Sequence, residues 1–422
     1  MNVLLLGNGF DLHHNLPTMY NDFLQTVDFM MTHLVKDGCT IGDIFSEQSL
    51  QKKSRHIEKC YAVHKASYNQ IYLDIKDTGK IIDLARNNVW FSYLLTSVQE
   101  DKQWIDAERE VAFVLQMMEE LFEVADGDPM IVDVQCSAAC RYVVDCFPFF
   151  YTEKPTKVLG TNRYKEVIEE YYQEYPPNSG NKSVDKNKVI EKLYKELEEF
   201  AECLRLYLKC FVDNGLDLIK KEEEFKRLEA ICSINQAITF NYTNAAEKLY
   251  SQFHVFHLHG RVEDKIILGI NPDENDMLGS VDTTVLAFKK YYQRACMATD
   301  ESYIKWIKQM KNSNEELSLL IMGHSLDVTD KDIIIELFDR SNEIIILHHT
   351  EESKRTLIKN LIKIFGYEEF YRIRNSKNLS FMSTDSDFAE FREKRETKQY
   401  QELAQRMIID EYNRKCEQIV VV

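Results

Sequence analysis

The sequence predicts an α/β fold, with a Rossmann-like, mainly parallel sheet covered by helices and a large all-helical insertion after the first strand. Two observations lead to this prediction. Short, continuously apolar runs occur at the amino terminus and again after residue 230. Between them lies a long region with apolar residues at helical spacing and no proline from 18 to 128. Runs that are apolar throughout indicate strands buried on both faces, as in parallel sheets between helices.

The first predicted strand is "NVLLLG", residues 2–7. The later strands are predicted in "QAITFNY", "FHVFHLHG", "KIILGI", "LSLLIMGHS", "NEIIILHH" and "LSFMST", with helices in "DKDIIIELFDR" and "ESKRTLIKNLIKIFG". Residues 1–25 and 231–422 are therefore assigned to one sheet domain, and 26–230 to a mainly helical insertion domain.

Within the insertion, one apolar stripe recurs at steps of three and four residues, at Ile190, Leu193, Leu197, Phe200, Leu204, Tyr207 and Phe211. This spacing places the stripe on one face of a helix, where core packing is the expected role. The segment 130–144, "MIVDVQCSAACRYVV", reads equally well as a strand or as a buried helix. An insertion of this size also suggests self-assembly or autoinhibition.

Composition excludes several classes of protein. The formal net charge of −17 disfavours direct binding to nucleic acid or to an anionic membrane. The apolar runs are too short to span a bilayer, and we expect a cytoplasmic protein. The ten cysteines include no Cys-x-x-Cys pair and are expected to be reduced. Cys136 and Cys140 lie one helical turn apart, but they lack the partners that a zinc site needs.

The turn "GNGFD", Gly7 to Asp11, follows the first predicted strand. Two glycines there allow backbone amides to approach a pyrophosphate at a helix amino terminus, although a tight structural turn explains them equally well. The dinucleotide fingerprint calls for a third glycine or alanine, and this chain has Leu12 instead. An ordinary NAD-dependent dehydrogenase is therefore disfavoured.

Polar residues also follow two middle strands. Asn241 and Thr243 lie two residues apart, so both can face one pocket, although an Asx-type turn is an alternative. His257 and His259 likewise share one strand face, and Gly260 after them permits a close approach. A histidine at a strand end can exchange a proton near neutral pH, whereas the spacing of possible partners argues against a metal.

A further strand ends in Gly323, His324 and Ser325. Small residues and open amides there suit the ribose or a phosphate of an adenosine. Asp327 follows, and Asp330 is best explained as the N-cap of the next helix.

The ordered combination of these motifs resembles the sirtuin-like superfamily of NAD-consuming enzymes. More narrowly, "LLLGNGFDLHHNLPTMYNDFL", "WIDAERE", "ITFNYTN" and "FHLHG" are similar to the AbiH family of bacterial abortive-infection proteins. The resemblance covers the first 25 residues, a short stretch near Trp104 and most of 236–332.

The resemblance implies that the protein is an antiphage effector that hydrolyses NAD⁺ to ADP-ribose and nicotinamide, without a metal. It assigns His259 as the catalytic base and Asn241 to the nicotinamide ribose or the attacking water. The residues implied to bind NAD are Gly7, Asn8, Gly9, Phe10, Asp11, Thr243, His257, Gly260, Gly323, His324 and Ser325. Two departures from sirtuins, Thr243 in place of an acid and the missing cysteine-bound zinc module, put protein deacylation in doubt.

Within "WIDAERE", Asp106 or Glu108 could supply a cation-stabilising acid from the insertion. Residues at i and i+2 on a helix do not face one another, so we expect at most one in the site and the other in solvent. Two alternatives stay open: a sensor of NAD or ADP-ribose that signals through a partner without catalysis, and, with less support, a metal-dependent nuclease. We also expect a homo-oligomer or a partner subunit of a defence system.

Overall fold

The computed structural model describes residues 1–33, 35–99, 106–124, 130–131, 137–155, 163–174, 182–219, 234, 236–250, 253–270, 283–313, 317–376 and 379–383. The predicted domain boundary at 230/231, residues 384–422 and Cys136 lie outside this set. None of the seven described cysteines forms a disulfide. No described helix combines the length and the apolar character that crossing a membrane requires.

The described residues form one six-stranded sheet in which every neighbouring pair of strands is parallel. Its strands are β1 (Asn2–Leu6), β7 (Gln236–Thr239), β8 (His254–His257), β9 (Leu317–Met322), β10 (Ser341–His348) and β11 (Leu379–Ser383). They are ordered β8-β7-β1-β9-β10-β11. This is the Rossmann order, in which β7 and β8 are added on one side of β1 and the later strands β9, β10 and β11 on the other side. The predicted Rossmann-like fold is confirmed, and its switch point lies between β1 and β9.

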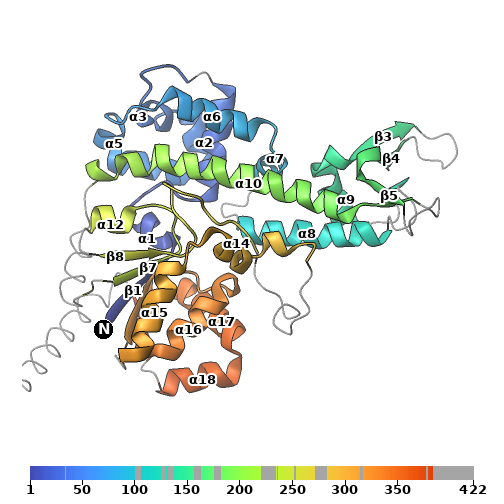
Figure 1. The fold of residues 1–422 in the computed structure, drawn as a ribbon. Helices are drawn as coiled ribbons and strands as arrows, with labels where there is room; N and C mark the ends of the chain where they lie inside the picture. Colours follow the sequence, from blue (N-terminus) through green and yellow to red (C-terminus); the bar gives the residue numbers. More distant parts are fainter. Residues whose placement is uncertain are drawn as a thin grey trace, which may run out of the picture.

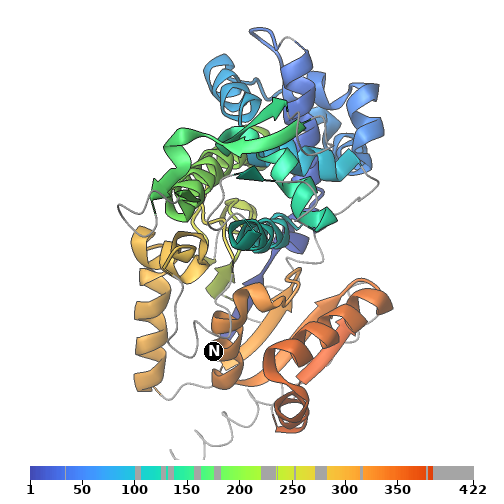
Figure 2. The same cartoon turned by 90° about the vertical axis from the view of Figure 1, so that its right-hand side faces the viewer.

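Both faces of the sheet are buried, and alternate residues of each strand serve opposite faces. Val3 and Leu5 belong to a core shared with α15 (Glu301–Ser313), α16 (Lys331–Arg340), α17 (Glu351–Phe365) and α18 (Tyr367–Ser376). Leu4 and Leu6 belong to a second core that continues into the insertion. Figures 1 and 2 show these layers, with the insertion on one side of the sheet and α15 to α18 on the other.

The insertion begins after the short helix α1 (Asn8–His13) and is mainly helical. Its helices are α2 (Tyr20–Thr32), α3 (Ile41–Phe45), α4 (Gln48–Lys53), α5 (Arg55–Tyr68), α6 (Ile75–Arg86), α7 (Val89–Gln99), α8 (Ala107–Val124), α9 (Ala138–Cys146) and α10 (Lys186–Phe211). Short 3-10 helices in the insertion are η1 (Pro148–Phe150), η2 (Glu169–Tyr171) and η3 (Asp213–Leu218), and the sheet domain contains η4 (Leu286–Phe288) and η5 (Val328–Asp330). The predicted stripe of α10 is buried, as expected for core packing.

The expectation of an all-helical insertion is wrong at one end. β2 (Met130–Ile131), β3 (Tyr151–Pro155) and β4 (Arg163–Val167) form an antiparallel sheet, and β5 (Tyr172–Glu174) pairs with β6 (Lys182–Val184). These strands lie at the far end of α8 and α10, where they extend away from the main sheet (Figure 1). The undecided segment 130–144 contains both structures, β2 and most of α9.

The predicted strand "KIILGI" does not join the sheet. Gly260 has a φ of +76° and turns the chain back, so that Gly260 and Ile266 form an isolated antiparallel bridge. The backbone N–H of Ile267 then donates to the carbonyl of His259 at 2.8 Å. The run is apolar because Ile266 and Ile267 are buried, and burial alone does not identify a strand. The helices α12 (Ala245–Leu249) and α14 (Lys290–Met297) complete this region.

Candidate functional site

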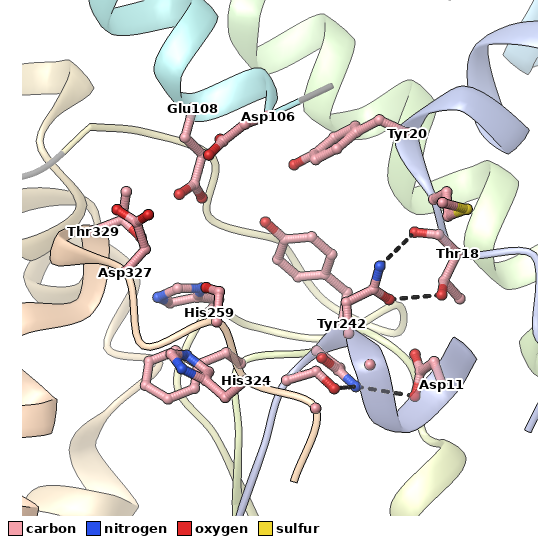
Figure 3. Close-up of a pocket in the computed structure, with 18 of the residues that line it drawn as sticks. Asp11, Thr18, Tyr20, Asp106, Glu108, Tyr242, His259, His324, Asp327 and Thr329 are labelled. Atoms are coloured by element: carbon pink, nitrogen blue, oxygen red, sulfur yellow. Dashed lines mark hydrogen bonds between the residues drawn. The ribbon is translucent and has the colours of Figure 1, made fainter. Parts of the chain in front are cut away.

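A cavity of about 220 Å³ lies beyond the carboxyl ends of β1, β7 and β9, at the switch point where Rossmann-like sheets bind ligands (Figure 3). It is bounded by the loops after these strands and by the insertion. The residues that line it are Gly7, Asn8, Gly9, Asp11, Thr18, Met19, Tyr20, Asn21, Asp106, Glu108, Leu204, Leu208, Phe240, Asn241, Tyr242, Thr243, His259, Lys290, Gly323, His324, Ser325, Asp327, Thr329 and Asp330.

The structure brings together most of the site residues that the sequence suggested. Those at the cavity are Gly7, Asn8, Gly9, Asp11, Asn241, Thr243, His259, Gly323, His324 and Ser325. Their positions span more than 300 residues of sequence, and the parallel sheet collects them because its strands all end at one edge.

Phe10, His257 and Gly260 do not line the cavity. Phe10 is fully buried, and its ring lies 4.6 Å from that of His14. His257 has Nδ1 3.2 Å from the carbonyl of Asn241 and Nε2 2.8 Å from Glu247 Oε1, so it supports the loop from behind. Gly260 is required by the turn itself, since a Cβ there would lie 1.9 Å from the carbonyl oxygen of Lys265. The structure therefore places these three residues outside the cavity lining, and their contact with NAD stays a prediction.

Gly7, Gly9 and Gly323 allow two loops to touch. A Cβ on Gly7 would lie 2.6 Å from His324 Cα, and one on Gly323 would lie 2.2 Å from the Phe10 nitrogen. The amide of Gly7 donates to Met322 and that of Gly9 to Gly323, at 3.2 and 2.8 Å. The turn thus joins β1 to β9, and it offers fewer amides to a phosphate than its glycines suggest.

Asp330 stands at the N-cap position of α16, as predicted, but its side chain caps no backbone amide. Instead, Oδ1 lies 3.2 Å from both His259 Nε2 and Lys290 Nζ, and Oδ2 lies 3.4 Å from His324 Nε2. The ion pair with the buried ammonium group of Lys290 explains why the side chain points to the cavity instead of capping the helix. Asp330 is therefore a member of the site that sequence reasoning placed elsewhere.

The two histidines beside Asp330 are held in defined orientations. The amide of Leu326 donates to His324 Nδ1 at 2.9 Å, which leaves the proton of a neutral ring on Nε2 toward Asp330. Burial lowers the pKa of His259 to about 4, and the nearby Lys290 charge acts in the same direction. His259 is therefore neutral at physiological pH and can accept a proton.

Lys290, which sequence reasoning missed, is the buried cation of the site. Its side chain is 2% exposed, and Nζ lies 2.7 Å from Glu108 Oε2. Burial opposes its charge, but Asp330 and Glu108 outweigh burial and raise its pKa. Burial raises the pKa of Glu108 to about 7, against the opposing effect of Lys290. No motif around "FKKYYQ" signals this role.

Asp106 and Glu108 both line the cavity, so the expectation of at most one is wrong (Figure 3). Asp106 precedes α8 rather than lying on it, and its Oδ1 accepts from the amide of Arg109 at 3.2 Å. The rule for i and i+2 on a helix therefore does not apply. The guanidinium of Arg109 also pairs with Asp327 in the loop after β9, which ties the insertion to the sheet domain.

Asp11 and Asn241 form a buried polar pair at the floor of the cavity. Asn241 Nδ2 donates to Asp11 Oδ1 at 3.0 Å and to the carbonyl of Gly7 at 3.1 Å. Thr243 Oγ1 donates to Asp11 Oδ2 at 2.7 Å. Burial raises the pKa of Asp11 to about 7, partly offset by these two side-chain donors. Asn241 and Thr243 thus face one site, as their spacing suggested.

Two tyrosines that sequence reasoning also missed, Tyr20 and Tyr242, line the cavity (Figure 3). The hydroxyl of Tyr242 donates to the carbonyl of Ile267 at 2.7 Å.

Across the described residues, no three His, Cys, Asp or Glu side chains are grouped so that they could hold a metal ion.

The family comparison agrees with this arrangement of motifs. The family model described as "Bacteriophage abortive infection AbiH" matches residues 3–349, which include every residue that lines the cavity. Neither the curated proteins nor the solved structures contain a match to this chain. Because the family match extends over most of the sequence, the chain belongs to the AbiH family, and its role is in phage abortive infection.

Proposed function

We propose that this protein hydrolyses the N-glycosidic bond of NAD⁺, with His259 as the general base and Asn241 as the residue that orients water or the nicotinamide ribose. One observation carries the proposal. A neutral histidine and an asparagine, from the ends of neighbouring parallel strands, line one cavity at the switch point of a Rossmann-ordered sheet. The resemblance of the motifs to sirtuin-like NAD-consuming enzymes supports the choice of substrate.

The placement of His259 suits a base. Its Nε2 lies 3.2 Å from Asp330 Oδ1, and no described residue forms a hydrogen bond with Nδ1. A carboxylate on one ring nitrogen favours the tautomer whose lone pair is on the other. We infer that Asp330 orients the ring and that Nδ1 accepts the proton.

In the proposed reaction, the oxygen of water bonds to C1′ of the ribose as the bond from C1′ to the nicotinamide nitrogen breaks. The bonding electrons move to that nitrogen and neutralise its positive charge, so nicotinamide leaves as a neutral molecule. His259 takes one proton from the water and later releases it. The products are ADP-ribose, nicotinamide and a proton.

The charges around the cavity suit a cationic transition state. Asp106, Asp327 and Asp330 line it, whereas Lys290 is its one lining lysine or arginine among the described residues. Fixed carboxylates close to a developing oxocarbenium ion stabilise it without reorganisation. The neutral state of His259 avoids placing a further cation there.

The test is to incubate the purified protein with NAD⁺ and to identify products by chromatography, with the wild type beside His259→Ala. We expect nicotinamide and ADP-ribose from the wild type and about a 1,000-fold slower reaction from the variant, as for loss of a general base. Cells that express the protein during phage attack should also lose NAD⁺. An activated protein that protects cells while NAD⁺ stays constant would contradict the proposal, and binding without turnover would favour a sensor.

A further inference from the structure

The hydrogen bonds of Asn241 define which end of its side chain faces the cavity. The amide nitrogen has two hydrogens, and both are used: one toward Gly7 O at 3.1 Å and one toward Asp11 Oδ1 at 3.0 Å. Both acceptors lie in the turn after β1. The carbonyl oxygen Oδ1 has no hydrogen-bond partner among the described residues, although Asn241 is 7% exposed and lines the cavity.

Asp11 makes this orientation the stable one. The Gly7 carbonyl can only accept a hydrogen bond, and so can the Asp11 carboxylate whenever it is ionised, so both reject the carbonyl end of the asparagine. Its second oxygen is occupied by Thr243 Oγ1 at 2.7 Å, which fixes the carboxylate itself. Asp11 is 1% exposed, and a buried carboxylate is costly unless donors surround it. Turning the amide of Asn241 over would remove one donor and bring two oxygens together.

We propose that Asp11 is a positioning residue, which holds Asn241 so that its carbonyl oxygen faces the cavity and accepts a hydrogen bond from a hydroxyl group or a water of the bound ligand. This inference rests on the proposed function for the identity of the ligand. In that reaction the donor is a ribose hydroxyl or the attacking water. Asn241 therefore acts as an acceptor and not as a donor to the substrate.

Asp213 provides a matched control. It is also buried, at 3% exposed, and also pairs with an asparagine of the same segment, since it accepts from the backbone amide of Asn244 at 3.1 Å and from its side-chain amide. It does not line the cavity. A substitution at Asp213 thus removes the same kind of buried pair without changing a residue that lines the cavity.

The experiment is a double-mutant cycle on NAD⁺ turnover with Asp11→Leu, Asn241→Ala, the double variant and Asp213→Leu. We expect Asp11→Leu to lower kcat about 100-fold, Asn241→Ala to lower it about 1,000-fold, and the double variant to match Asn241→Ala. KM for NAD⁺ should change less than about threefold in Asp11→Leu. Asp213→Leu should lose stability but keep its kcat.

Losses that multiply in the double variant would overturn the inference, because Asp11 would then act independently of Asn241. If Asp11→Leu does not fold, Thr243→Val replaces it in the cycle, since it removes only the hydroxyl that fixes Asp11. If the wild type binds NAD⁺ without hydrolysing it, only the proposed function fails, and the same cycle is measured as NAD⁺ affinity by calorimetry. A wild type that neither binds nor hydrolyses NAD⁺ overturns both proposals.

Discussion

Glu108 of the insertion and Lys290 of the sheet domain form a buried ion pair, with Glu108 Oε2 2.7 Å from Lys290 Nζ. The lysine also lies 3.2 Å from Asp330 Oδ1. One cation therefore links the insertion to Asp330, the carboxylate beside His259. The wall contributed by the insertion and the wall that carries His259 and Asp330 depend on each other electrostatically.

Breaking this ion pair should cost stability. We expect Lys290→Met to lower the free energy of unfolding by about 3 kcal/mol or more, because it leaves Glu108 and Asp330 buried without their cation. Glu108→Gln should cost less, since Asp330 still pairs with the lysine. Urea unfolding of both variants and of the double variant measures the coupling. Strictly additive costs would show that the two side chains do not interact.

Substitutions of the two neighbouring histidines, His257 and His259, should have very different effects on NAD⁺ hydrolysis. His259→Gln should slow NAD⁺ hydrolysis by a factor of about 100 to 10,000, the range for general bases. His257→Gln should slow it less than about tenfold, because His257 does not line the cavity. Its hydrogen-bond partners among the described residues are the backbone carbonyl of Asn241 and the side-chain carboxylate of Glu247. Initial rates at saturating NAD⁺ provide the comparison. Equal losses in the two variants would refute the assignment of His259.

The effect of Asp11 on stability should depend on pH. Burial raises its pKa in the folded protein from 3.8 to about 7, so the folded state holds a proton that the unfolded state has lost in this range. The contribution of Asp11 to the free energy of unfolding is thus largest at low pH and falls as the pH rises toward 7. The Asp11→Asn variant cannot ionise at this position, so its free energy of unfolding should rise relative to that of the wild type by up to about 1.4 kcal/mol per pH unit. Urea unfolding at pH 5 and pH 8 tests this, and a constant difference would contradict it.

Two glycine-to-alanine substitutions should change the stability of the protein in opposite directions. Gly323 has a φ of +68°, and a Cβ there would lie 2.2 Å from the Phe10 nitrogen. We expect Gly323→Ala to cost about 2 kcal/mol or more. Gly79 lies inside α6, and a Cβ there would meet nothing within 4 Å, so Gly79→Ala should stabilise by about 0.5 to 1 kcal/mol. Thermal unfolding of both variants is sufficient, and a stable Gly323→Ala protein would argue against the close loop contact.

The sheet and the positions of the motifs were predictable because a change from apolar to polar residues in the sequence shows where each strand ends. Each motif at the cavity follows an apolar run, as with Asn241 after β7 and Gly323 after β9. Parallel pairing then brings those ends to one edge without further information. The fold class and the ten predicted site residues that line the cavity required no more than this.

The electrostatics of the site were not predictable in the same way. Lys290 lies in a sequence without a motif, and its role comes from Glu108, which is 182 positions away, and from Asp330. The local rule for helix capping placed Asp330 correctly in the chain but missed its side-chain partners. "KIILGI" was misassigned because a buried loop against helices is as apolar as a buried strand.

The position of β1 at the start of the chain also affects protein synthesis. Its two neighbours in the sheet, β7 and β9, are translated more than 200 residues later, and Asp330 later still. At usual elongation rates of about 5 to 20 residues per second, a ribosome needs many seconds to supply them. A nascent chain, or one terminated before these strands, therefore lacks the assembled cavity.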